Sequence, residues 1–459
     1  KIIQKYTDNE DETLLPQFSL DGDDQHSANI FKKPHYDLNN VWRVVLICSL
    51  LVLAETFCFY SSGISTMMIQ RQVKIKSTIS DSIFTFAVLA SLIIMLARKQ
   101  LDSDKQIIQQ GLTLILIAIC CSIIDLALEI IYFNSSKQYI TIFIVIYGWS
   151  SAVLAAIGDI LLTIGSFCYI MKCIPIKKDY GLVISFIMFI TVTGSQLFRW
   201  LYSPELQNML SRTVILYIGM VTTFISIIVV HYVIPIPNFN INERTIEQVG
   251  IDYKTKWLPK WIQFYSYILG KTIIGSILCA LSCLVMIFHF WYAVYVQEQK
   301  FVIVRPECNS FDQFWSCPDI LVAFQINLGL EIVIRAIFYA AFGLAFDSIN
   351  RPSMYKIRVL SSILMLFSLI GVSMPHLITF DSFYSRQTFQ VMIFIATSLW
   401  QPLLWITLLS VFDGCFKLTS CISFSFLNLT RFIANIIQIF TDQLWFSVGL
   451  SLFSISLVF

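Results

Sequence analysis

The chain is dominated by stretches of about 20 mainly apolar residues, separated by short polar segments. An α-helix of that length crosses the hydrocarbon core of a bilayer, and in lipid every backbone polar group must be bonded within the segment. Only 13% of the 459 residues are charged and 57% are hydrophobic, which argues against a water-soluble enzyme. The sequence therefore predicts an all-α integral membrane protein that crosses the bilayer many times.

The apolar stretches predict about twelve spans in two groups of six. We place them at residues 42–66, 80–97, 110–133, 139–171, 180–202, 212–235, 263–296, 319–346, 356–378, 387–412, 416–440 and 442–459. The most polar internal segment divides the groups. The predicted organisation is an N-terminal tail at 1–41, a six-helix bundle at 42–235, a linker at 236–262 and a second six-helix bundle at 263–459.

Lysine and arginine near the span ends predict the orientation. If the tail is cytoplasmic, the inside loops hold about twice as many of these cations as the outside loops. We therefore expect both termini and the linker in the cytoplasm. The net charge of +2 implies no nucleic-acid partner, and the lipid bilayer is the expected surrounding.

The sequence contains no pattern that indicates a cofactor, a metal site or an enzyme. The histidines lack metal-ligand spacing, and there is no phosphate-binding loop, dinucleotide fingerprint or nucleophile elbow. We expect none of these activities.

A short motif follows the eighth predicted span. Gly343, Asp347 and Arg351 recur at four-residue spacing, which allows close helix approach at the glycine and bridging between helix ends by the acid and the base. This loop resembles the Gly-x-x-x-Asp-x-x-x-Arg pattern of the major facilitator superfamily. The corresponding loop of the first group is short and basic, but Arg98 stands at the Asp position and the glycine is missing.

The resemblance implies two six-helix bundles related by pseudo-two-fold symmetry, with a binding site between them that opens alternately to each side. In span 1, Glu55, Phe57, Phe59 and Tyr60 are similar to the Glu-x-x-Glu-Arg-Phe-x-Tyr-Tyr signature of proton-coupled oligopeptide transporters. Val52 and Thr56 replace its first Glu and its Arg. Glu55 is then either a proton-coupling carboxylate or a neutral acid bonded to a neighbouring hydroxyl.

Further ionisable residues lie inside predicted spans, where charge is costly and commonly functional. Asp125 and Glu129 share one helix face, so they cannot both ionise cheaply without a cation. Asp159 either belongs to a proton or cation relay or bonds to another helix. Lys271 either holds an anionic group or extends its amine to the membrane surface.

The second group carries the best-defined charge pair. Glu331 and Arg335 are four residues apart in the favourable order, so they form either a structural salt bridge or a pair that opens on binding. Arg431 has no local partner in the sequence. With the acids of the first group, these residues suggest a polarised site for a zwitterion or an organic anion with a proton.

Two peripheral features complete the predictions. Cys308 and Cys317 flank an outside loop, where they form either a disulfide or two free thiols. Glu10, Leu14 and Leu15 fit an acidic dileucine sorting signal, which suggests sorting adaptors as partners and an endosomal, lysosomal or plasma-membrane location.

The sequence thus predicts a secondary active transporter of a small polar or charged solute, with a proton as a candidate co-substrate in symport. The alternative is a transporter-like membrane subunit or receptor that does not transport.

Overall fold

The computed structural model describes residues 38–73, 85–91, 104–135, 138–173, 180–202, 209–234 and 318–349, together with residue 83 and short helical pieces between 355 and 436. Side chains within the first helix are described from 41 to 61. Every regular element in these ranges is a helix. Six helical segments among them are long and apolar enough to cross a membrane.

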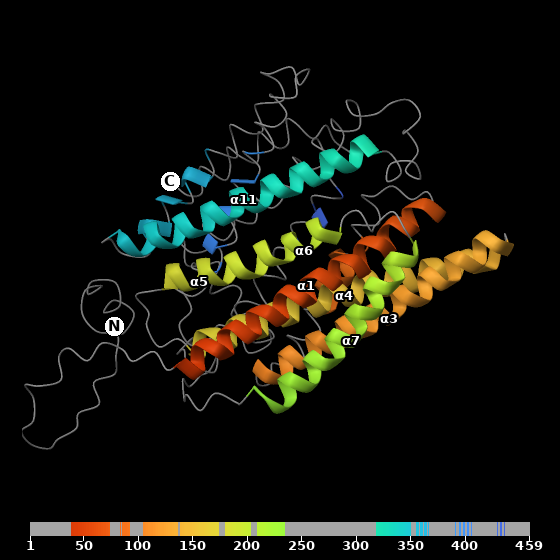
Figure 1. Cartoon of the computed structure of the whole chain (residues 1–459), viewed down its shortest axis with the longest axis horizontal. Helices are drawn as coiled ribbons and strands as arrows, with labels where there is room; N and C mark the ends of the chain where they lie inside the picture. The colour runs from red at the N-terminus through yellow and green to blue at the C-terminus, as the bar shows by residue number, and fades with distance from the viewer. Residues whose placement is uncertain are drawn as a thin grey trace, which may run out of the picture.

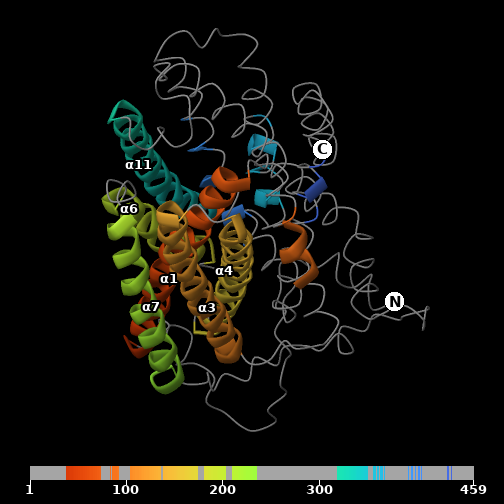
Figure 2. The same cartoon turned by 90° about the vertical axis from the view of Figure 1, so that its right-hand side faces the viewer.

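The helices of the N-terminal half form one bundle, and a helix of the C-terminal half lies beside it (Figure 1). The bundle contains α1 (Leu38–Val73), α3 (Asp104–Ser135), α4 (Gln138–Cys173), α5 (Tyr180–Met188), η3 (Phe189–Thr193), α6 (Gly194–Tyr202) and α7 (Met209–Tyr232). α11 (Pro318–Ser348) packs along α5, η3 and α6. Seen from the end, α1, α3, α4 and α7 lie together and α11 crosses beside α6 (Figure 2).

Small residues bring α3 and α4 into close antiparallel contact. A Cβ added to Gly111 would lie 2.7 Å from the backbone nitrogen of Leu162, and one added to Gly158 would lie 2.8 Å from the carbonyl oxygen of Gly111. In lipid, apolar side chains gain nothing by leaving one apolar surrounding for another, so close backbone packing is a main source of helix association. The glycines therefore fix the register of this pair.

The fifth predicted span has an interruption at its centre. η3 is a π-helical turn that joins α5 and α6, and Gly194 directly after it lies against α1, where an added Cβ would be 2.9 Å from Val52 Cγ2. π-helical turns inside α-helices are rare and frequent at functional sites, because the extra residue redirects the side chains that follow. The side chains of α6 are therefore turned relative to those of α5.

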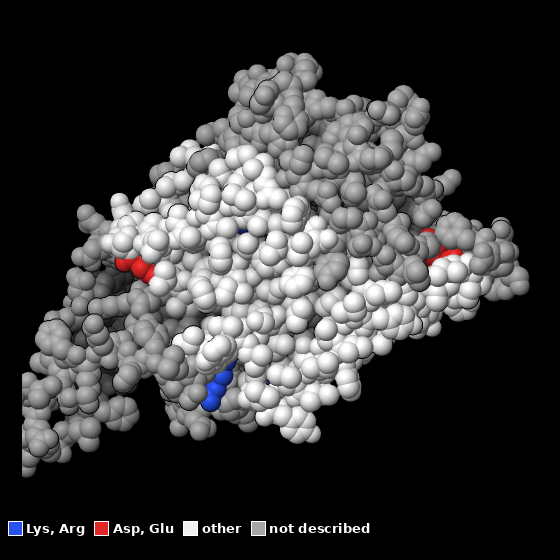
Figure 3. Space-filling model, in the orientation of Figure 1, with Lys and Arg blue, Asp and Glu red and all other residues white. Residues whose placement is uncertain are grey.

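The outer faces of the described helices suit a lipid surrounding. Large apolar side chains of α7 are exposed, including Val214, Ile218, Val221, Phe224 and Ile228. Charged side chains are nearly missing from the described part of the face in Figure 3 and lie near its edges. An exposed apolar surface of this extent is what a membrane-spanning bundle presents to acyl chains.

The prediction of an all-α membrane protein is confirmed. The spans predicted at 42–66, 110–133, 139–171, 180–202, 212–235 and 319–346 correspond to α1, α3, α4, the α5–η3–α6 segment, α7 and α11. Of the spans at 80–97, 356–378, 387–412 and 416–440, the structure describes only short helical pieces. The tail to residue 37, the linker at 236–262 and the spans at 263–296 and 442–459 lie outside the described residues, so their boundaries stay predictions.

Candidate functional site

The best-defined polar group is the charge pair on α11. Arg335 Nε and Nη2 each lie 2.7 Å from Glu331 Oε1. Arg335 Nη1 also donates to the hydroxyl of Tyr339 at 3.3 Å, one further turn along the same helix. A helix places residues four apart on one face, so local sequence alone aligns all three side chains.

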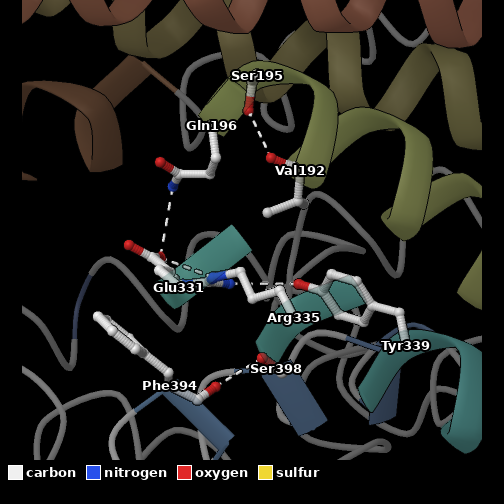
Figure 4. A network of polar contacts seen from close by, with 8 residues as sticks. All are labelled: Val192, Ser195, Gln196, Glu331, Arg335, Tyr339, Phe394 and Ser398. Carbon is white, nitrogen blue, oxygen red and sulfur yellow. Dashed lines mark hydrogen bonds and ion pairs between the residues drawn. The ribbon is translucent and has the colours of Figure 1, made fainter. Parts of the chain in front are cut away.

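The α11 pair is connected to the N-terminal half through two helices. Gln196 Nε2 on α6 donates to Glu331 Oε1 at 3.5 Å, and Glu55 on α1 interacts electrostatically with Tyr339. We call Glu55, Gln196, Glu331, Arg335 and Tyr339 the interface cluster. Figure 4 shows Gln196 extending from the redirected helix toward Glu331, with Arg335 between Glu331 and Tyr339.

The burial and charge of the interface cluster make it chemically unusual. Arg335 and Glu331 are only 12% and 15% exposed. The cluster holds two carboxyl groups and one guanidinium, so both signs of charge lie deep in a low-dielectric surrounding. A buried pair of this kind is a weak source of stability, but breaking it is expensive. In a site of this kind, the carboxylate and the guanidinium can give up their bond to each other and bind a charged ligand or a proton instead.

A second polar contact joins the halves at one end of the bundle. Asp347 at the end of α11 accepts from the backbone N–H of Leu182 at 2.7 Å and of Gly181 at 3.2 Å, in the first turn of α5. These donors have no partner within their own helix, and the helix N-terminus favours a carboxylate. The close approach depends on Gly343, because a Cβ there would lie 2.8 Å from the Cβ of Ser185.

Lys356 completes this contact from the next helical piece. Its Nζ donates to the carbonyl oxygen of Phe346 at 2.6 Å and lies 4.9 Å above the ring of that residue. A cation at a helix C-terminus is favoured by the helix dipole. We call Gly181, Leu182, Gly343, Asp347 and Lys356 the end contact.

Other predicted site residues lie deep in the N-terminal bundle. Asp125 and Glu129 on α3 are 1% and 0% exposed, and Tyr60 on α1 is 1% exposed. Asp159 lies in α4, about two turns from Ser151 and away from Asp125. Within the described part of the chain, no group of three His, Cys, Asp or Glu residues could hold a metal ion.

Several residues of the predicted site lie outside the part of the chain that the structure describes. Those outside the residues with described side chains are Glu10, Leu14, Leu15, Lys271, Cys308, Cys317, Arg351 and Arg431. The structure does bring Glu55 toward Tyr339, which accepts a hydrogen bond from Arg335, whereas Asp125 and Glu129 lie on α3, which forms no part of the interface cluster.

Sequence reasoning missed three participants. Gln196 and Tyr339 belong to the interface cluster, and Lys356 belongs to the end contact. The sequence could have indicated Gln196, because it is an amide within a mainly apolar span. Tyr339 also lies one turn beyond Arg335, but nothing in the sequence states which tyrosines face inward.

Comparison with known proteins identifies the fold. No protein-family model matches the chain, and no curated protein matches it either. Solved structures of the major facilitator superfamily do match. The chain resembles a bacterial homologue of the iron transporter ferroportin, in the outward-facing state with soaked iron, with a TM-score of 0.61 and 12% identity, over 90% of this chain and 96% of that one.

A second match supports the same architecture. The proton:xylose symporter XylE, a major facilitator protein bound to 6-bromo-6-deoxy-D-glucose, aligns with a TM-score of 0.57 and 13% identity, over 91% of this chain and 95% of that one. The chain therefore has the major facilitator superfamily fold, as its loop motif predicted. At such identities the likeness shows the fold alone.

Proposed function

We propose that this protein is a secondary active transporter that moves a small polar or charged solute across a membrane by alternating access. The observation that carries the proposal is the interface cluster, because its charges are buried where helices of the two halves meet. Charge at such depth is costly, and transporters place their substrate and ion sites there. The shared fold supports the same class of function.

The chemistry of the interface cluster supports a solute that carries both charges, such as a zwitterion. Arg335 can hold an anionic group through paired N–H donors, and Glu331 can then receive a cationic group or a proton. Glu55 supplies a second carboxyl group next to Tyr339, which suits proton coupling. The sequence likeness of the Glu55 segment to proton-coupled transporters supports this assignment.

The end contact supports alternating access, because it holds the two halves together at one end. A second contact lies at the same end, where Phe167 near the end of α4 stacks on Trp405 with ring centroids 4.0 Å apart and an interplanar angle of 3°. Transport requires both contacts to separate when the opposite end closes. The predicted orientation puts this end in the cytoplasm.

Uptake into proteoliposomes tests the proposal. Purified full-length protein is screened with amino acids, peptides, sugars and organic anions, with and without an inward proton gradient. We expect concentrative uptake of at least one charged solute class, at least tenfold weaker for Arg335→Gln. Arg43→Gln near the start of α1 serves as the charge-removing control and keeps uptake at the wild-type level.

Proton coupling has its own readout in the same vesicles. Glu55→Gln is expected to abolish stimulation by the proton gradient while solute exchange at equal pH continues. Absence of uptake for every class, with correctly folded protein, would contradict transport and favour a non-transporting subunit or receptor.

A further inference from the structure

A second polar region lies inside the N-terminal bundle, on α3 and away from the interface cluster. Ser122, Asp125 and Glu129 follow one another at the three- and four-residue spacing of a single helix face. The same face continues toward Gly111 and the tight contact with α4. These polar groups therefore point at a neighbouring helix and not at lipid.

The register of α3 against α4 shows which α4 residue lies opposite Asp125. Gly111 lies against Leu162, and Ser122 Oγ lies 2.6 Å from Ser151 Oγ. Continuing the same antiparallel register by one turn sets Asp125 opposite Gly148, and by a second turn sets Glu129 opposite Ile144. Gly148 and Ile144 are both buried, and neither has a polar side chain to offer.

A buried serine triad lies one turn from Asp125, and its hydroxyls bond to one another and to backbone carbonyls. Ser61, Ser122 and Ser151 come from α1, α3 and α4, and their hydroxyl oxygens lie 2.6 to 2.8 Å from one another. Ser151 donates to the carbonyl of Ala118, and Ser122 donates to the carbonyl of Ser61. The hydroxyl of Ser61 lies within hydrogen-bond distance of both other hydroxyl oxygens, where it can donate or accept.

Among the described residues, Asp125 therefore has no hydrogen-bond partner for either carboxyl oxygen, and it is 1% exposed. Glu129 and Cys121 on α3 interact with it electrostatically. On the helices packed against α3, Tyr60 adjoins Ser61 on α1, Tyr147 adjoins Gly148 on α4, and Arg212 lies near the start of α7. The register of α3 against α7, fixed by Cys120 and Met220, sets Arg212 at the level of Glu129 and not of Asp125.

The electrostatic neighbours of Asp125 add to the free-energy cost of its ionised form. Glu129 and Cys121 interact with it, and both are groups that become negative. An ionised carboxylate without hydrogen bonds in an apolar surrounding is among the most costly arrangements in a protein, and binding a proton removes the charge.

We propose that the Asp125–Glu129 pair is a proton-binding site within the N-terminal bundle, with the proton resident on Asp125 at neutral pH. A metal or sodium ion fits less well, because a hard cation needs about six oxygen ligands and the facing positions are Gly148 and Ile144. The inference is independent of the proposed transport, since it concerns protonation alone.

Infrared spectroscopy of the full-length protein in detergent at neutral pH tests the site. A protonated carboxyl group gives a carbonyl-stretch band that moves on transfer to heavy water. We expect Asp125→Asn to remove one such band, because asparagine mimics the neutral acid in shape. Asp347→Asn, which changes a carboxylate held by two backbone N–H groups, is expected to leave the band in place.

Two further measurements test the protonated aspartate without relying on the Asp125→Asn variant. Labelling all aspartates with heavy carbon in the unmutated protein should shift the band, which covers the case that the Asn variant does not fold. Absence of any protonated aspartate band would overturn the proposal. So would loss of the band, or a raised thermal midpoint, when sodium chloride replaces choline chloride, because that result would assign a sodium site.

Discussion

At the scale of single residues, the Glu331–Arg335 pair combines a contact within one helix with contacts from two other helices. Its atoms lie 2.7 Å apart within one helix, so the pair could form without any other part of the protein. The contacts from Gln196 and from Glu55 are different, because they depend on helices more than 130 residues away in the chain. They connect the pair on α11 to α6 and α1, so a movement of one half against the other would change its contacts.

A charge-deletion series separates a structural role of this pair from a functional one. Arg335→Gln should lower the free energy of unfolding by about 3 kcal/mol, because it leaves Glu331 buried without its cation. Adding Glu331→Gln should restore most of that loss, since two neutral amides can bond to each other. Thermal unfolding of the purified protein measures both effects.

Uptake by the same variants measures whether the pair is also needed for transport. The double variant should stay inactive although its stability recovers. Wild-type uptake by the stable double variant would show that the pair is only a structural salt bridge.

At the scale of elements, close packing of α3 on α4 fixes the geometry of the N-terminal bundle. Gly111 and Gly158 meet backbone atoms, which cannot move away as a flexible side chain can. This contact sets the register that leaves Asp125 opposite Gly148. The π-helical turn acts in a similar way on the neighbouring span, because it turns Gln196 toward α11.

Two glycine substitutions provide a matched comparison of this packing. Gly158→Ala should destabilise the protein by about 1–3 kcal/mol, because its Cβ would lie 2.8 Å from the carbonyl oxygen of Gly111. Gly329→Ala on α11 should be neutral or stabilising, since among the described residues its Cβ would meet Trp200 Nε1 at 3.7 Å, an ordinary contact distance, and alanine favours helix. Thermal midpoints in detergent distinguish the two, and equal midpoints would contradict the packing argument.

At the scale of the whole molecule, the end contact joins α11 of the C-terminal half to α5 of the N-terminal half. Asp347 joins the end of α11 to the start of α5, and Phe167 near the end of α4 stacks on Trp405. Among the described residues, these contacts add to the packing of α11 along α5, η3 and α6. Such an arrangement suits a closure that must open in every transport cycle.

Weakening the end contact should open that end. Asp347→Asn removes the charge from two hydrogen bonds at a helix N-terminus, which is worth about 1–2 kcal/mol, or roughly a tenfold shift in population. A cysteine introduced at the buried Ser185, in a background without other cysteines, should then react severalfold faster with a water-soluble maleimide.

The neighbouring residue supplies the control for this experiment. Ser348→Ala removes a hydroxyl that bonds to Ala345 within the same helix, so it should leave the labelling rate unchanged. Equal rates for Asp347→Asn and Ser348→Ala would mean that Asp347 does not hold the end closed.

What the sequence alone determined is local or compositional. Long apolar stretches specify membrane helices because lipid leaves the backbone no other way to satisfy its hydrogen bonds. Four-residue spacing aligns Glu331 with Arg335 and Asp125 with Glu129, because both pairs depend only on helix geometry. The Gly343–Asp347 motif predicted a bridge between helix ends, and it also indicated the fold.

Only the tertiary structure decided which partners these residues have. Helices that are apolar on every side carry no stripe that marks their inner face, so the sequence cannot say that Gln196 meets Glu331 or that Asp347 meets the start of α5. Asp125 is the clearest case. Its neighbours along the chain do not show which helix it faces. Its lack of a hydrogen-bond partner among the described residues follows from the register that Gly111 and Gly158 impose on two helices.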